Sequence, residues 1–425
     1  MFQRLKGTRD IYGLEEKVLN LIENKFFRII KNYNFKRICT PIIEDANLFI
    51  RSVGETSDIV SKEMYLFKDN GQRDIALRPE GTASTIRAFV ENKINNLEPT
   101  KLAYFGPMFR YERPQKGRYR QFIQGGVELI ENSTVENNFE IIKLAYDFLK
   151  SLKISNITLE INNLGSFESR NNYIEILKEY FSKYKEQLSE ISLIRLQKNV
   201  LRILDDKEEI KKDFVKNAPR LIDYLSSIEK ERFNNLLDLL DEFKIKYVIN
   251  PYLVRGLDYY NDVVFEFVSN SDALGSQCTV LGGGRYDGMI KSFGGPDIGS
   301  IGFAFGVDRL MEIIMSNIDN YPELSFNETI LIAYLNEDEK NEIRKIAYDL
   351  RKNFQVIFPS QKQSIKSLFK LQYKLQPKYL IFKELNMKKN ELKIKSVLNE
   401  RNIIYTNLDE FKNIISEMKR DENNE

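Results

Sequence analysis

Two alternating stretches joined by a short basic loop constrain the fold of this chain more than any other feature. They are KLAYFGPMFRYE (101–112) and RYRQFIQGGVELI (118–130), separated by RPQKG. Side chains alternate along a β-strand, and a Gly- and Pro-containing loop reverses the chain. The pattern therefore predicts an antiparallel hairpin with a protruding, positively charged loop.

One face of this predicted hairpin is polar on both strands. The first strand places on it Tyr104, Gly106, Met108, Arg110 and Glu112, and the second places on it Arg118, Arg120, Phe122, Gln124, Gly126 and Glu128. The small Gly126 is expected to clear space between Gln124 and Glu128. On the face pattern alone, a solvated hairpin with cross-strand ion pairs is as good an interpretation as a binding site.

The residue types on this face indicate what kind of ligand a site here would take. Arginine forks match phosphate and carboxylate oxygens, and Phe122 offers a plane on which a purine can stack. Gln124 and Glu128 are suited to hold an ammonium group or an N–H donor. We therefore expect a ligand that carries both anionic oxygens and nitrogen-bound hydrogens.

The composition excludes several mechanisms, because the 425 residues include no histidine. Zinc sites that need histidine, and Ser-His or Cys-His catalysis, are ruled out. Cys39 and Cys278 lie far apart and form no CxxC pair, so a disulfide framework is not expected and a reducing, cytoplasmic setting fits. The 64 Lys+Arg and 62 Asp+Glu give a net charge of +2, which neither demands nor excludes nucleic acid.

The length predicts two or three domains, and the patterns order them. No run of 18 apolar residues or signal peptide is found, so no membrane association is expected. The first part reads as a helix at 14–33, a strand at 36–43, a hairpin at 64–77 with DNGQ as its turn, and a helix within 78–94 with Thr82 as N-cap.

The rest of the chain changes character twice. Residues from about 134 to 248 read as largely helical, strand and glycine-turn patterns return at 251–295, and a buried strand feeds a helix at 298–315. After a linker at 316–328, strands and helices alternate to the end and close with a helix. A small α/β domain with a mainly parallel sheet is expected there.

Two further polar clusters stand in apolar surroundings. LRPEGT (77–82) places Glu80 at a helix start, where a carboxylate also serves simply as a cap. LVRGLDYY (253–260) places Arg255 before two tyrosines, although a surface turn would read the same way. LGGGRYDG (281–288) is weak evidence for a phosphate loop, because it lacks the strand and helix context of a Rossmann site.

Taken together, these segments resemble class II aminoacyl-tRNA synthetases, and specifically the histidyl-tRNA synthetase family. KGTRD (6–10) resembles the family's N-terminal signature, and TPIIED (40–45) its motif 1. GPMFRYERPQKGRYRQFIQGGVE (106–128) is similar to motif 2 and GFAFGVDRLM (302–311) to motif 3. LVRGLDYYNDVVFEF and LGGGRYDG are similar to the two peptides that mark histidine specificity.

The resemblance implies an α+β catalytic domain with an antiparallel sheet, the class II synthetase fold, over residues 1–325. It carries a helical insertion at about 167–248, and an α/β anticodon-binding domain follows at 328–425. The implied activity is ATP-dependent activation of L-histidine and its transfer to the 3′ end of tRNA(His). The implied setting is a cytoplasmic homodimer that uses ATP and Mg²⁺ and has no metal site of its own.

The resemblance also implies roles for individual residues. For ATP they are Arg110, Glu112, Arg118, Phe122 and Arg309. For histidine they are Glu80, Thr82, Gln124, Glu128, Arg255, Tyr260 and Tyr286. Arg110 and Arg255 are the implied catalytic residues, and Arg113 and Gln115 are implied to meet the tRNA acceptor end.

Two alternative functions share much of this pattern. One is the catalytically silent paralogue that regulates histidine biosynthesis, which matches the family only over the catalytic domain. The other is a synthetase-like sensor domain within a kinase, which the absence of a kinase segment disfavours. The chain also departs from the family pattern at Ile123, usually histidine and expected to face away from the site, and at Gly125, usually bulkier, which could loosen the layer behind the sheet.

Overall fold

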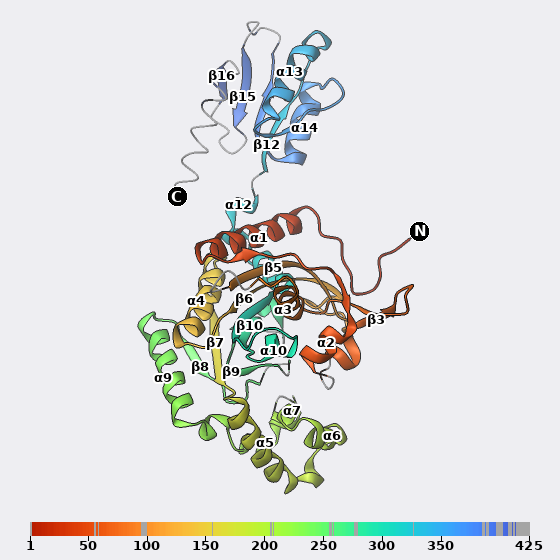
Figure 1. Cartoon of the computed structure of the whole chain (residues 1–425). Helices are drawn as coiled ribbons and strands as arrows, with labels where there is room; N and C mark the ends of the chain where they lie inside the picture. The colour runs from red at the N-terminus through yellow and green to blue at the C-terminus, as the bar shows by residue number, and fades with distance from the viewer. Residues whose placement is uncertain are drawn as a thin grey trace. The chain divides into compact units, whose positions relative to one another are not determined.

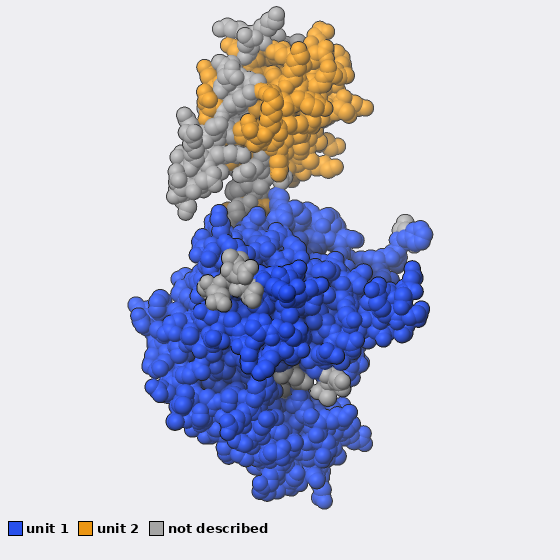
Figure 2. Space-filling model, in the orientation of Figure 1, with its two compact units in different colours: residues 1–317 blue, residues 318–425 orange. Residues whose placement is uncertain are grey.

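The computed structural model divides the chain into two compact units, residues 1–317 and 318–425 (Figure 2). The division falls within the linker expected at 316–328. The structure describes residues 2–54, 57, 59–94, 100–154, 156–204, 206, 208–254, 257, 259–275, 279–325, 327–384, 387, 391–396, 403–406, 410 and 413.

The first unit is built on an eight-stranded sheet of order β1-β5-β6-β11-β10-β9-β7-β8. It is antiparallel except for the two outermost pairs, β1 with β5 and β7 with β8, so the expected antiparallel sheet is confirmed. The strands are β1 (Lys36–Arg37), β5 (Thr100–Phe109), β6 (Gln121–Ile130), β7 (Ile157–Asn163), β8 (Tyr247–Ile249), β9 (Asn261–Ser269), β10 (Thr279–Arg285) and β11 (Ser300–Gly306).

Three helices pack together against one face of this sheet, α1 (Leu14–Asn32), α4 (Val135–Ser151) and α11 (Val307–Ser316). Figure 1 labels α1 and α4. The helix predicted at 14–33 is confirmed, because apolar residues at every fourth position form its buried stripe. Phe26 of α1 and Phe148 of α4 lie 5.0 and 4.6 Å from the Phe305 ring of β11. This aromatic layer leaves the opposite face of the sheet for polar groups.

A small three-stranded sheet of order β2-β4-β3 stands beside the main one. Its hairpin of β3 (Tyr65–Lys68) and β4 (Asp74–Leu77) confirms the predicted turn. The single strand predicted at 36–43 is wrong. The chain leaves the main sheet after β1 and enters the small sheet at β2 (Ile43–Asp45), and Pro41 between them has no N–H for a ladder. The helices α2 (Ala46–Val53) and α3 (Thr82–Glu91) and the π-helical turn η1 (Ile59–Glu63) complete this region.

The helical insertion is present, but the helical region expected from 134 onward is interrupted by a strand. ITLEINN folds as β7 of the main sheet, because it alternates and carries β-branched residues that suit a strand. Three of the insertion's helices, α5, α6 and α9, are preceded by a serine whose side chain accepts a backbone N–H of the first turn. The insertion comprises α5 (Phe167–Ser182), α6 (Glu190–Lys198), α7 (Leu201–Leu204), α8 (Asp213–Lys216), α9 (Ser227–Glu242) and the 3-10 turns η2 (Lys185–Gln187), η3 (Glu209–Lys211) and η4 (Leu221–Tyr224).

The second unit has a five-stranded sheet of order β13-β12-β14-β15-β16. β12 pairs in parallel with both neighbours, but β14, β15 and β16 pair antiparallel. The expected mainly parallel sheet is therefore a mixed one, because β14 to β16 follow one another without a crossover helix. The final helix expected from the sequence lies largely outside the described residues. The elements are α12 (Pro322–Ser325), β12 (Asn327–Ile332), α13 (Lys340–Leu350), β13 (Gln355–Ile357), α14 (Ile365–Leu375), β14 (Pro377–Phe382), β15 (Leu392–Ser396) and β16 (Ile403–Thr406).

The remaining short elements of the described chain are η5 (Asp272–Leu274), α10 (Met289–Ser292), η6 (Ile318–Asn320) and η7 (Glu337–Glu339). Within the described residues, none of the helices combines the length and the apolar character needed to cross a bilayer.

Candidate functional site

A cavity of about 450 Å³ opens on the polar face of the main sheet. Nine of the residues predicted to form the site line it: Glu80, Thr82, Arg110, Glu112, Arg118, Phe122, Gln124, Tyr260 and Arg309. Glu128 and Tyr286 are buried beside it. Arg255 lies outside the described residues, and Arg113 and Gln115 are exposed on the loop between β5 and β6.

The hairpin that carries this face is shorter than predicted. Its paired strands end at Phe109 and begin again at Gln121, so Arg110 and Arg118 project from the connecting loop. An Arg110 N–H donates to the Arg120 carbonyl at 2.9 Å and fixes the start of that loop. The basic residues therefore stand on a braced loop at the cavity rim, and not on the strands themselves.

The floor of the cavity is made of residues without large side chains. Gly282 of β10 pairs with Ala304 of β11. Gly282 and Ala304 both line the cavity. A flat ligand can therefore lie directly against the sheet.

Three arginines form a cationic end. Arg110, Arg118 and Arg309 line the same cavity, and the pKa of Arg309 is lowered, first by burial and then by the neighbouring Arg118 charge. Glu112 offsets part of this charge, with one oxygen 2.7 Å from Nε of Arg118. Mutual repulsion among partly buried guanidinium groups favours an anion between them.

Phe122 lies beneath this end, with the Arg110 guanidinium 5.3 Å from its ring centre. Arg110 is held in that position by a 2.9 Å hydrogen bond to the Pro79 carbonyl. An aromatic plane beside a fixed cation is suited to a purine base next to phosphate. This agrees with the role predicted for Phe122, which remains a proposal.

The opposite end of the site is acidic and buried. Glu128 is fully buried, and burial raises its pKa to about 8. The hydroxyls of Tyr286 and Thr82 act in the other direction, and the Tyr286 hydroxyl donates to Glu128 Oε2. Among the described residues no hydrogen bond reaches Glu128 Oε1. A buried carboxylate oxygen of this kind is prepared to accept an N–H from a ligand.

Glu80 does what the simpler interpretation of LRPEGT predicts, since it caps α3. Its oxygens accept the backbone N–H groups of Thr82 at 2.6 Å and Ala83 at 2.8 Å. The prediction of Thr82 as N-cap is wrong: Gly81 is the N-cap and Thr82 the first helical residue. The cap rigidly places Glu80 and Thr82 on the cavity wall, where burial raises the pKa of Glu80. Gln124 joins them by accepting the Gly81 N–H at 3.0 Å.

Tyr104 is a buried residue of the site to which the sequence assigned no role. Its ring fills the space that a Cβ at Gly81 would need, since such an atom would lie 2.2 Å from the ring. A Cβ at Gly126 would lie 2.4 Å from the Tyr104 hydroxyl. The expectation that Gly126 clears space for ligand is therefore wrong, because Tyr104 occupies that space. Burial and the charges of Glu128 and Glu80 raise the pKa of Tyr104. The face pattern put Tyr104 and Gly126 on the same face, and the structure shows that they are paired across the two strands.

Arg120 does not join the other arginines. Its guanidinium lies 3.7 Å from the centre of the Tyr111 ring, outside the cavity lining. Face counting misplaced it because the ladder ends at Gln121, and strand alternation no longer applies beyond that residue.

The N-terminal KGTRD segment helps to fix the start of α11 against β6, a role that the sequence analysis did not predict. Arg9 Nη2 lies 2.6 Å from Asp308 Oδ1 of α11, and Asp308 Oδ2 accepts the Ile123 N–H at 3.0 Å. Arg309, the next residue of α11, is thereby fixed against β6. An arginine in one motif and an aspartate in another was the only available signal.

The two departures from the family pattern are both accommodated. Ile123 is half-buried and does not line the cavity. At Gly125 a Cβ would lie 2.3 Å from the Phe305 ring, so Phe305 fills the space of the missing side chain. The layer behind the sheet is therefore not loosened at Gly125.

The cavity has a cationic end and a buried acidic end, with a flat floor between them. Such a site can bind two ligands side by side, an anionic one at the first end and one with N–H donors at the second. The carboxylates of Glu112 and Glu266 also face the cavity and both act on the charge of Arg309. One or two carboxylates together with substrate phosphates is the ligand set that Mg²⁺ prefers, so these residues fit that ion. The sheet topology and this site are those of the catalytic domain of class II aminoacyl-tRNA synthetases.

The comparisons with known proteins assign the chain more narrowly. The family described as histidyl-tRNA synthetase matches residues 7–310. The chain belongs to the histidyl-tRNA synthetase family. It is 44% identical over 420 residues to a histidine–tRNA ligase of Mycoplasmopsis pulmonis, covering 98% of this chain and 99% of that protein. A Dictyoglomus thermophilum histidine–tRNA ligase is 44% identical over 392 residues, with 92% and 93% covered.

Solved structures agree. The apo histidyl-tRNA synthetase of S. aureus matches with a TM-score of 0.80 at 31% identity, covering 96% of this chain and 98% of that one. A Bacillus halodurans structure named as an ATP phosphoribosyltransferase regulatory subunit/histidyl-tRNA synthetase matches at TM-score 0.64 and 23% identity, covering 90% and 98%. That second likeness shows the fold alone.

Proposed function

We propose that this chain activates L-histidine with ATP and transfers it to the 3′ end of tRNA(His). The observation that carries the proposal is the division of one cavity into an arginine end and a buried carboxylate end. The chain is 44% identical to two histidine–tRNA ligases over more than nine-tenths of its length, which supports the enzymatic function over that of the regulatory paralogue.

ATP occupies the arginine end in this proposal. Arg118, Arg309 and Glu112 hold the outer phosphates and their Mg²⁺, and adenine stacks on Phe122. Mg²⁺ adds positive charge at the phosphate oxygens when it is bound. Arg110 lies between Phe122 and the Pro79 carbonyl, which fits a contact with the α-phosphate.

Histidine occupies the carboxylate end. Glu80, Thr82 and Gln124 stand together on the α3 side of the cavity and take the α-ammonium group. Glu128 Oε1 accepts an imidazole N–H, while Tyr260 engages the other ring nitrogen. Tyr286 acts by holding Glu128, because its hydroxyl is already bonded to that carboxylate.

The reaction needs no general base from the protein, which fits a chain without histidine. The substrate carboxylate is ionised at neutral pH and attacks the α-phosphorus of ATP, forming the C–O–P bond while the bond to the pyrophosphate oxygen breaks. Arg110 and Arg255 stabilise the negative charge that accumulates at the α-phosphate. In the transfer step the terminal ribose hydroxyl attacks the histidyl carbonyl, its proton passes to a phosphate oxygen of the adenylate, and AMP leaves.

Specificity follows from the burial of Glu128. An amino acid without an imidazole N–H would leave that carboxyl group desolvated and unpaired, at a cost of roughly several kcal/mol. The site therefore rejects other amino acids because they leave the Glu128 carboxyl group without a hydrogen-bond partner, and not by size alone.

The tRNA and the second subunit occupy other surfaces in this proposal. Arg113 and Gln115 are exposed on the motif 2 loop, where they can reach the acceptor end. The lysines along 361–374, on and before α14, are assigned to the anticodon side. Apolar side chains exposed on β2 and β3 support a homodimer through motif 1: Ile43, Leu66 and Phe67.

Histidine-dependent exchange of pyrophosphate into ATP tests the function. The chain is expected to catalyse this exchange with L-histidine and with no other standard amino acid, in the absence of tRNA. If histidine supports no exchange while the protein binds histidine, the regulatory alternative replaces the enzyme.

A further inference from the structure

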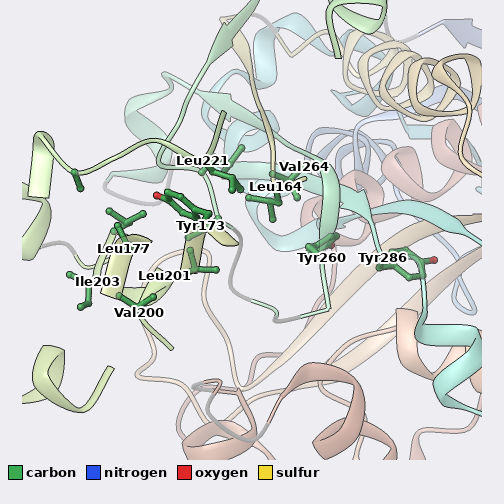
Figure 3. Close-up of a cluster of buried hydrophobic side chains, with 14 of the residues drawn as sticks. Leu164, Tyr173, Leu177, Val200, Leu201, Ile203, Leu221, Tyr260, Val264 and Tyr286 are labelled. Atoms are coloured by element: carbon green, nitrogen blue, oxygen red, sulfur yellow. The ribbon is translucent and has the colours of Figure 1, made fainter. Parts of the chain in front are cut away.

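The helical insertion and the histidine end of the site share one hydrophobic core. The two tyrosines of the specificity peptides, Tyr260 and Tyr286, belong to the same buried cluster as side chains of α5 and α7. Figure 3 shows Tyr260 and Tyr286 beside Leu164 and Val264, with the insertion residues continuing the cluster. The labelled insertion members are Tyr173, Leu177, Val200, Leu201, Ile203 and Leu221. The insertion is therefore not an appendage packed only against itself.

Polar contacts join the same two parts at the backbone of the pocket. Arg170, in the first turns of α5, donates from Nη1 to the Tyr260 carbonyl at 2.7 Å. The backbone N–H of Leu164 donates to the Asp262 carbonyl at 2.7 Å, and that of Asp262 donates to the Gly165 carbonyl at 2.9 Å. The segment that carries Tyr260 is thus bonded to the segment that begins the insertion.

The chain at this junction adopts a conformation that needs such support. Asp262 has a φ of 49°, in the left-handed region that non-glycine residues seldom adopt. Its side chain accepts from Asn163 at 3.0 Å, which adds a third bond to the turn. A strained residue two positions after Tyr260 persists only where its surroundings hold it, and here those surroundings are residues 163–165 and Arg170.

We propose that Arg170 is a positioning residue for histidine binding and that the helical insertion thereby sets the geometry of the histidine pocket. The inference rests on the proposed function, because it takes Tyr260 as a contact of the imidazole ring. Arg170 acts on Tyr260 through the Tyr260 backbone carbonyl, and Arg170 itself touches no substrate in this proposal. Its guanidinium holds the start of the strand β9, so that the Tyr260 side chain faces the cavity.

The same arrangement predicts which kinetic constant responds. Tyr260 lies at the carboxylate end, whereas the arginines that would hold ATP stand on motif 2 and motif 3. Loss of the Arg170 contact should therefore weaken binding of histidine and leave binding of ATP almost unchanged. A general loss of folding would instead lower the amount of active enzyme without separating the two substrates.

Pyrophosphate exchange with three variants tests the proposal. Arg170→Met removes the hydrogen bond, Arg170→Lys keeps the charge, and Arg195→Met is the matched control. Arg195 is also an arginine of the insertion, but it pairs with Asp206 within the insertion at 2.6 Å. KM for histidine, KM for ATP, kcat and the melting temperature are measured for each variant.

We expect Arg170→Met to raise KM for histidine by about tenfold or more, because it removes a charge-assisted hydrogen bond. KM for ATP should stay within about twofold of the native value. Arg170→Lys should recover part of the loss, and Arg195→Met should leave both KM values unchanged. An unchanged KM for histidine in Arg170→Met, or an equal rise in Arg195→Met, overturns the proposal. If Arg170→Met does not fold, Arg170→Gln, whose shorter and uncharged side chain loses the charge-assisted bond, is measured in its place, and an unchanged KM for histidine there overturns the proposal. Absence of exchange by the native chain contradicts the proposed function instead.

Discussion

The two ends of the cavity are built in different ways. The carboxylate end sits on paired strands and a capped helix: Glu128 on β6, Thr82 on α3 and Tyr286 directly after β10. The arginine end projects from a loop and from the first turn of α11, at Arg118 and Arg309. In the proposed function, binding of the amino acid therefore relies on rigid, buried groups, whereas binding of phosphate relies on long side chains at the rim.

This difference has a physical basis. A small amino acid offers few contacts, so selectivity must come from fixed, buried polar groups. The cost of burying these groups is compensated only when the correct amino acid makes a hydrogen bond to them. A triphosphate carries its own charge, and long-range attraction by several arginines tolerates some motion. Substitutions at the two ends should therefore separate histidine from ATP.

The largest effect is expected at the carboxylate end, from Glu128→Gln. The amide keeps the shape but cannot ionise, so kcat/KM for histidine should fall by roughly 10³-fold, with KM for ATP within a few-fold. Steady-state pyrophosphate exchange measures both constants. Glu160→Gln is the control, because Glu160 stands on β7 of the same sheet, accepts a hydrogen bond from Asn250 and does not line the cavity. Equal losses for the two substrates would contradict the assignment of this end of the cavity to histidine.

The matching change at the arginine end is Arg309→Met. Removing one of three cations should raise KM for ATP by roughly 10²-fold and change KM for histidine by less than about threefold. The exchange assay with ATP as the varied substrate gives the answer. Arg344→Met serves as control, since Arg344 is exposed on α13 and contacts Asn341. A larger effect on histidine than on ATP would contradict the assignment of this end.

The burial of Glu128 also predicts a pH dependence of stability without ligand. Its pKa is raised from 4.5 to about 8 in the folded chain, so the folded state retains a proton that the unfolded chain releases. This contribution is full below pH 4.5 and is lost as pH rises through 8. Between pH 6.5 and 9 the native chain should lose about 2 kcal/mol relative to Glu128→Gln. Urea unfolding of both proteins at several pH values measures it, and parallel curves would contradict the burial of an ionisable group.

The smallest expected effect comes from Gly126→Ala, which probes the support under the carboxylate end. The added Cβ would meet the Tyr104 hydroxyl and the Phe303 carbonyl, so stability should fall by about 1–2 kcal/mol. Gly71→Ala lies in the exposed β3–β4 turn and should change stability by less than about 0.5 kcal/mol. Chemical denaturation compares the two, and a neutral Gly126→Ala would mean that Tyr104 does not fill this space.

Sequence patterns predicted the carboxylate end better than the rim, and the reason is local. Alternation along β6 placed Gln124 and Glu128 on the cavity face because those residues are in the ladder. Arg120 lies just beyond the ladder, and there a loop hydrogen bond and the Tyr111 ring decide its direction. Patterns within a strand are reliable only as far as the strand is paired.

Other features depended on contacts between distant parts of the chain. The bond from Arg9 to Asp308 joins residues 299 positions apart, and nothing local indicates it. The space filled by Tyr104 likewise depends on the approach of α3 to β5. β7 was overlooked because the region around it is strongly helical. The resemblance to a family named the site residues, but it could not say which of them support others.

A crystal structure of the chain soaked with L-histidine and a non-hydrolysable ATP analogue would show directly which ligand each end of the cavity binds. We expect the imidazole ring within hydrogen-bonding distance of Glu128 and the triphosphate between Arg118 and Arg309. An imidazole ring bound at the arginine rim, or phosphates bound beside Glu128, would contradict the division of the cavity into its two ends.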